Sequence, residues 1–308
     1  MNSVMALTAD ISKSISTASL LRTGSEILRT LSDLSLDVVA VCVLAGLFAA
    51  RLTGSTLASA WAVILGLAVW CIYTADHWLD ARRNGASSRL SRHRIHLRYE
   101  GAITVVWICV SFVGSTTALL LLPVPVLLGG LGLGVLAGLH LVLCQKTGFL
   151  WYPKELAVAA LFTGGIWLAP LLSGKPTVTV WVAFGLFGAA VFANLLLCSL
   201  LDYEVDAREA PNCLAQRWGP VTSRRVLMAL ALLAPFVAAS SGVALTSVSD
   251  LLSLLILVLL VGLPAWIARD PGETTRPGSL TLRRALADGA FLMCGLPVAL
   301  ELIRGTFV

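Results

Sequence analysis

Residues 178–206 read VTVWVAFGLFGAAVFANLLLCSLLDYEVD, a long apolar run that ends in three acidic residues. A helix needs about 20 apolar residues to cross the hydrocarbon core of a bilayer, and this run is long enough. The whole chain has the same character, because 57% of its 308 residues are hydrophobic and only 13% are charged. Soluble domains average about 25% charged residues. The composition therefore predicts an integral membrane protein.

Similar apolar runs recur along the chain and predict an all-α polytopic membrane bundle of about nine transmembrane helices. The expected spans are residues 34–50, 58–79, 101–122, 125–144, 156–173, 178–201, 224–246, 251–268 and 285–303. We expect residues 31–308 to form one transmembrane domain and residues 1–30 to form an N-terminal cytoplasmic arm. This arm lacks a compact apolar core with a cleavage site, so we do not expect a removable signal peptide.

The 22 Lys and Arg residues are divided unevenly between the two sides of this nine-span arrangement. All but Arg51, Lys175 and Arg304 fall in the N-terminal arm or in loops that follow even-numbered spans. Because Lys and Arg accumulate on the cytoplasmic side, we expect a cytoplasmic N-terminus and a C-terminus outside, in the plasma membrane if the source is bacterial. The net charge of +5 then reflects topology and contact with anionic headgroups, and we expect no nucleic-acid partner.

Two copies of one motif, Asp-x-x-x-Asp-Ala-Arg, stand where an even-numbered span meets its cytoplasmic loop. The first contains Asp76 and Asp80, and the second contains Asp202 and Asp206. Carboxylates at this spacing lie on one helix face and repel each other. Mg²⁺ would offset the repulsion, because it binds one or two carboxylates and completes its shell with water and phosphate oxygens. A single motif would also suit a solvated helix end, with Asp80 paired to Arg83, but two matching copies favour a functional site and an internal repeat.

This pattern resembles the UbiA superfamily of intramembrane prenyltransferases, which have nine helices, two Asp-rich motifs at the cytoplasmic ends of the second and sixth, and a Mg²⁺-dependent site for an isoprenyl diphosphate. The resemblance covers roughly residues 34–303. The second motif and the downstream stretch Leu214-Ala215-Gln216-Arg217-Trp218-Gly219 are similar to the family pattern. The first motif departs from it, because Ile72 and Tyr73 stand where the family has Asn and Asp. The resemblance therefore implies a divergent member.

The resemblance implies a transferase that uses Mg²⁺ and an isoprenyl diphosphate to prenylate a lipophilic acceptor. Its expected catalytic and metal-binding residues are Asp76, Asp80, Asp202 and Asp206. Ionisation of the diphosphate needs further positive charge. The expected diphosphate-binding residues are Arg92, Arg94 and Lys154. The same residues also suit a positive-inside signal in the loop and headgroup anchoring of the lysine.

Polar residues inside the spans are a third feature. His140 is expected to make a hydrogen bond within the bundle, with a role as base for the acceptor as the alternative. Asn194 lies two turns before Asp202 and about 80° around the helix, so it need not line the same cavity. Asp288 is expected to pair with Arg284, one turn earlier on the last span.

Two other functions are compatible with these residues. A UbiA-like terpene cyclase or lipid-phosphate enzyme would use the same metal site without an aromatic acceptor. A non-catalytic membrane carrier or binding protein would use the paired acids for a cation or a lipid headgroup. Against the carrier, both motifs lie at one membrane face, whereas transport sites lie near the midplane. The sequence leaves open the prenyl chain length, the acceptor and the oligomeric state.

Overall fold

The computed structural model of the chain describes most of its length, and the described residues form helices and turns with no strand among them. The described ranges are 31–84, 91–146, 153–204, 213–240, 248–269 and 279–305. Within these ranges, nine helical segments are long and apolar enough to cross a membrane. This confirms the predicted all-α bundle. The N-terminal arm lies outside the described residues, so the predicted division at residue 31 stays a prediction.

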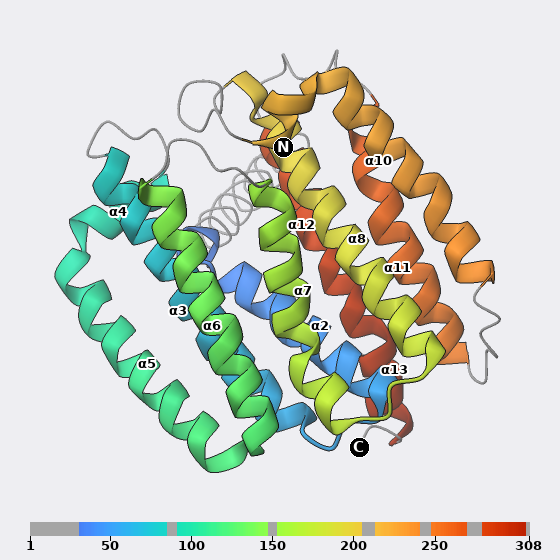
Figure 1. Cartoon of the computed structure of the whole chain (residues 1–308), viewed down its shortest axis with the longest axis horizontal. Coiled ribbons are helices and arrows are strands. Elements are labelled where there is room, and N and C mark those ends of the chain that lie inside the picture. Colours follow the sequence, from blue (N-terminus) through green and yellow to red (C-terminus); the bar gives the residue numbers. More distant parts are fainter. Residues whose placement is uncertain are drawn as a thin grey trace, which may run out of the picture.

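Each expected span corresponds to one segment of the structure (Figure 1). The first eight are α2 (Leu36–Thr53), α3 (Ala58–Asn84), α5 (Glu100–Leu121), α6 (Val124–Lys146), α7 (Lys154–Ser173), α8 (Val178–Leu201), α10 (Leu214–Ser240) and α11 (Val248–Ile267). The ninth is divided into α12 (Ser279–Gly289), the 3₁₀ helix η3 (Ala290–Cys294) and α13 (Gly295–Arg304). A short helix, α4 (Ser91–Arg98), follows α3.

Helices α2, α3, α7, α8 and α11 enclose the main apolar core, with η3 and α13 against it. Trp167 is fully buried there and makes ring contacts with Phe48 at 6.5 Å and with Phe187 at 6.2 Å. Helices α2 and α3 approach closely at Gly46, where an added Cβ would lie 2.9 Å from Leu65. Helix α5 has no buried residue, and α6 is almost as exposed. These two apolar helices therefore form a lipid-facing wall at one side of the bundle (Figure 1).

The ends of the helices divide into two groups. Helix α4, the start of α7, the end of α8 and the start of α10 lie at one end of the bundle, and the connections from α2 to α3, from α5 to α6 and from α7 to α8 lie at the other (Figure 1). Asp76, Asp80 and Asp202 are therefore at the same end of the bundle, as the alternation of spans predicts. Which end faces the cytoplasm stays a prediction.

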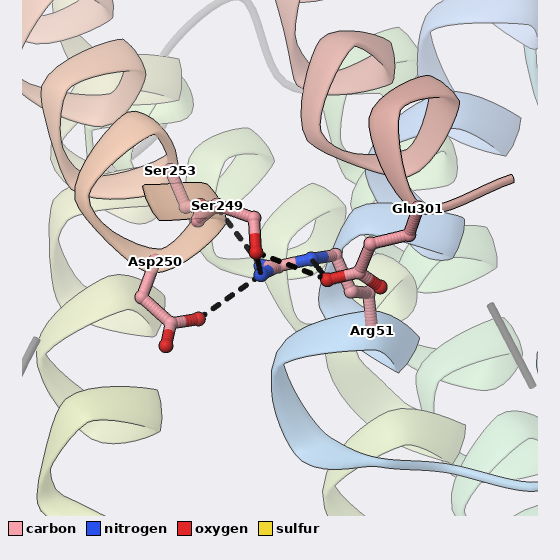
Figure 2. A network of polar contacts seen from close by, with 5 residues as sticks. All are labelled: Arg51, Ser249, Asp250, Ser253 and Glu301. Carbon is pink, nitrogen blue, oxygen red and sulfur yellow. Dashed lines mark hydrogen bonds and ion pairs between the residues drawn. The ribbon is translucent and has the colours of Figure 1, made fainter. Parts of the chain in front are cut away.

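At the opposite end, Arg51 joins three helices through a polar network (Figure 2). Its side chain, only 4% exposed, donates from Nε to Glu301 Oε1 at 2.6 Å and from Nη2 to Asp250 Oδ1 at 3.0 Å. It also donates to the hydroxyls of Ser249 at 2.6 Å and Ser253 at 3.0 Å. These contacts tie the end of α2 to the start of α11 and to α13, and the guanidinium pairs with two carboxylates.

The seventh span differs from its prediction. We expected it to begin at residue 224, whereas α10 begins at Leu214. Polar residues such as Gln216 and Arg217 gave this stretch the composition of a loop. Instead it forms a helical segment that ends in a kink at Gly219, whose φ of 76° and ψ of 161° interrupt the helix immediately before Pro220.

Candidate active site

The acids of the first motif lie on the last turns of α3. Tyr73, Asp76 and Asp80 are spaced by three and four residues, so they share one face of the helix. All three are half-buried. Neighbouring His77 is buried and lies 3.2 Å, Nδ1 to Oγ, from Ser35. Its ring is 5.5 Å from that of buried His96 on α4, so α2 and α4 both hold this end of α3 in place.

The arginine of the first motif points to another part of the structure. Arg82 pairs with Glu100 at the start of α5, and its guanidinium lies 4.0 Å above the ring of Trp78. The Trp78 indole N–H also donates to Glu100, at 3.1 Å. Because Trp78 and Arg82 are on the opposite side of α3 from Asp76 and Asp80, these contacts fasten α5 to α3 without entering the acidic face.

The second motif begins where α8 ends. Asp202 is the C-terminal cap of α8 and pairs with Arg284 of α12. Their side chains remain 32% and 35% exposed, respectively, so a ligand has access to both. Asp206 lies outside the described residues. The Gln216 side chain donates to the backbone carbonyl of Tyr203, which places the downstream Leu-Ala-Gln-Arg-Trp-Gly stretch beside the motif.

Glu155 is a site residue that the sequence reasoning missed. It is buried, and its Oε1 atom accepts from Ser199 Oγ and from the Leu214 backbone N–H, both at 2.8 Å. One carboxylate therefore joins α7 to the last turn of α8 and to the first residue of α10. Its Oε2 atom is buried and has no hydrogen-bond partner among the described residues. The available signal was an acid immediately before the span expected to begin at residue 156, next to Lys154.

Helix α12 connects the surroundings of the two motifs. Arg284 pairs with Asp202, and Asp288, one turn further along, accepts a hydrogen bond of 2.8 Å from the amide of Asn194 on α8. Asp288 also lies within electrostatic range of Tyr73, on the acidic face of α3, as does Asp76. Both residues of the expected Arg284–Asp288 pair thus reach α8, and Asn194 belongs to the same polar region as the motifs.

The acids suit a magnesium ion that is shared with a substrate. Among the described residues, no group of three or more His, Cys, Asp or Glu side chains is gathered closely enough to hold a metal. Mg²⁺ does not need such a group, because it binds through one or two carboxylates and takes its other ligands from phosphate and water. The accessible Asp76, Asp80 and Asp202 therefore fit an ion that a diphosphate helps to bind.

The basic residues expected at the diphosphate lie on α4 and at the start of α7. Arg94 is exposed on α4, and the side chain of Arg92 lies outside the described residues. Lys154 is half-buried in the first turn of α7, within electrostatic range of His140 on α6. His140 Nε2 lies 3.5 Å from the Sγ atom of Cys144 on the same helix. The roles of Arg92, Arg94 and Lys154 at a diphosphate stay predictions.

Comparison with solved structures defines the class of fold. The structure of a UbiA homologue from Archaeoglobus fulgidus bound to GPP and Mg²⁺ matches with a TM-score of 0.65 at 14% identity, covering 88% of this chain and 99% of that chain. A second structure of a UbiA homologue from the same organism matches with a TM-score of 0.62 at 13% identity, with coverages of 88% and 98%. No protein-family profile and no curated protein sequence matches the chain. The chain therefore has the UbiA fold, as predicted.

Proposed function

We propose that the chain is an integral membrane prenyltransferase of the UbiA superfamily, which transfers a prenyl group from an isoprenyl diphosphate to a lipophilic acceptor. The observation that carries this proposal is the match to a UbiA homologue bound to GPP and Mg²⁺, which covers 99% of that homologue's chain. The acid motifs support it independently, because Asp76 and Asp80 on α3 and Asp202 at the end of α8, the second and sixth spans, lie at the same end of the bundle.

The diphosphate would bind between the two motifs. Asp76 and Asp80 on one side, and Asp202 and Asp206 on the other, would hold Mg²⁺. When bound, this ion would neutralise charge that develops on the leaving diphosphate. Arg284 adds a residue to the proposed site, because a guanidinium can bind phosphate oxygens in a bidentate manner. If Arg284 left Asp202 to bind the diphosphate, the Asp202 carboxylate would become available to bind Mg²⁺.

The apolar spans would protect the reaction from water. An allylic cation reacts with any water within reach, so transfer to a lipophilic acceptor requires a dry site beneath the diphosphate. The face of α3 below Asp76 and the face of α8 before Asp202 consist mainly of apolar residues. Acceptor and prenyl chain would both enter this region from the bilayer.

Binding of a labelled substrate tests the proposal. Purified full-length protein in detergent is incubated with radiolabelled geranyl diphosphate, with Mg²⁺ or with a chelator. We expect Mg²⁺-dependent binding, reduced roughly tenfold or more in Asp76→Ala and in Asp202→Ala because each removes a charged ligand. The proposal would be overturned if the wild type bound no geranyl diphosphate in the presence of Mg²⁺, or if both variants bound it as tightly as the wild type does. Counterflow in proteoliposomes that depends on the same acids would favour a carrier.

A further inference from the structure

Asn194 and Asp288 form a polar pair inside the membrane-spanning part of the bundle. Asn194 lies in α8, two turns before Asp202, and Asp288 lies in the last span about 9 Å along the helix from Leu282. The Asn194 amide donates to Asp288 Oδ1 at 2.8 Å. Polar pairs at such depth are costly in hydrocarbon and usually serve binding or catalysis. The diphosphate site proposed above does not use either residue.

This pair faces the interior of the bundle. Asp288 is exposed, yet its hydrogen bond to α8 and its proximity to Tyr73 of α3 place it between helices. An exposed carboxylate at this depth requires a polar cavity, because lipid cannot solvate it. Tyr73 shares the face of α3 that carries Asp76 and Asp80. Asp288 therefore lies near the face of α3 where the diphosphate is proposed to bind.

The pair offers hydrogen-bond acceptors for a ligand. The Asn194 amide nitrogen is committed to Asp288, which fixes the orientation of the amide and leaves Oδ1 as an acceptor. This Oδ1 atom is buried and accepts no hydrogen bond from the described residues. Asp288 adds carboxylate oxygens beside it. A buried acceptor without a donor is energetically costly, so the arrangement favours a ligand that supplies one.

We propose that Asn194 and Asp288, with Tyr73 opposite, form the subsite for the polar end of the acceptor, and that this end is a neutral group carrying a hydroxyl. A hydroxyl donates one hydrogen bond and needs no counter-charge, so it satisfies Asn194 Oδ1 or the Asp288 carboxylate directly. An acceptor with a free carboxylate would be repelled by Asp288. This inference rests on the proposed function only in naming the ligand as the acceptor.

A pair of matched probes tests the subsite. Binding of 4-decylphenol and of 4-decylbenzoate, which share one apolar tail, is measured with the purified full-length protein in detergent at neutral pH. We expect the phenol to bind roughly tenfold or more tightly than the benzoate. Asn194→Leu and Asp288→Asn should each weaken phenol binding by roughly tenfold as well. Asp288→Asn should also reduce the difference in affinity between the phenol and the benzoate.

Two controls separate this proposal from the previous one. Asp37→Asn removes another carboxylate that lies within electrostatic range of Tyr73, but this carboxylate bonds to the Val38 backbone N–H. Phenol binding by this control variant should therefore stay near the wild-type value. Retained Mg²⁺-dependent binding of geranyl diphosphate by Asn194→Leu and Asp288→Asn would show that the variants fold. If the protein bound no diphosphate, circular dichroism would replace that check and the phenol result would still stand. Equal binding of the two probes, or phenol binding unchanged in both variants, would overturn the subsite.

Discussion

The carboxylate of Glu155 lies where α7, the end of α8 and the start of α10 meet. It accepts two hydrogen bonds from segments that flank the second motif, one from Ser199 before the motif and one from Leu214 after it. Removing the carboxylate would leave the Ser199 hydroxyl and the Leu214 backbone N–H in buried surroundings without their acceptor. Glu155 therefore acts on Asp202 through the backbone, as a positioning residue.

For Glu155→Ala we expect a loss of stability of about 1–3 kcal/mol, because two buried donors lose their partner. Thermal unfolding of the purified protein in detergent would measure the loss. Glu155→Gln is the matched variant, since its amide oxygen can accept the same two hydrogen bonds. It should lose clearly less stability than Glu155→Ala. Equal melting temperatures for the alanine variant and the wild type would show that the carboxylate does not hold these segments together.

The backbone conformation of Gly219 leads to a second prediction about a single residue. Its φ of 76° with ψ of 161° is accessible almost only to glycine, so Gly219→Ala should cost about 1–3 kcal/mol. Gly132 is the control, because it lies inside α6 and an added Cβ would meet no atom within 4 Å. Gly132→Ala should be neutral or slightly stabilising. Melting temperatures in detergent compare the two, and a smaller effect at Gly219 than at Gly132 would contradict the kink.

At the scale of elements, Arg51 joins α2, α11 and α13 at the end of the bundle opposite the acid motifs. Arg51→Met would leave Asp250 and Glu301 in a largely buried site without a cation, at a cost of about 3–5 kcal/mol. Exposed Arg304, on the last turn of α13, is the control, and Arg304→Met should change stability by less than about 0.5 kcal/mol. Similar melting temperatures for the two variants would show that the network contributes little.

The elements differ in how far the sequence predicts them. Hydropathy alone finds the spans, because crossing a bilayer requires a long apolar run. It misplaces the start of α10, since Gln216 and Arg217 are polar but lie in a helical segment that Gln216 bonds to Tyr203, just after α8. The motif acids are predictable because they recur at one spacing. The partners Glu155, Asn194 and Arg284 are not, because their contacts come from helices far apart in the chain and leave no local pattern.

At the scale of the whole molecule, the nine candidate spans among the described residues predict that Leu36, where the first begins, and Arg304, where the last ends, lie on opposite sides of the membrane. Alkaline phosphatase fused after Val308 should be active in a Gram-negative host, because this enzyme works only after export. The same reporter inserted in the loop between α6 and α7 should be inactive, and this fusion is the control. The reverse pattern of activity would show that the bundle is inserted in the opposite orientation.

The proposed function requires both acid motifs to bind the same Mg²⁺-diphosphate. Its most direct test is a double-mutant cycle on Mg²⁺-dependent binding of geranyl diphosphate to the wild type, Asp76→Asn, Asp202→Asn and the double variant. If one ligand contacts both motifs, each single variant should weaken binding roughly tenfold or more, and the double variant should lose less than the sum of the two free energies. Strictly additive losses, or one variant that binds normally, would contradict a shared site.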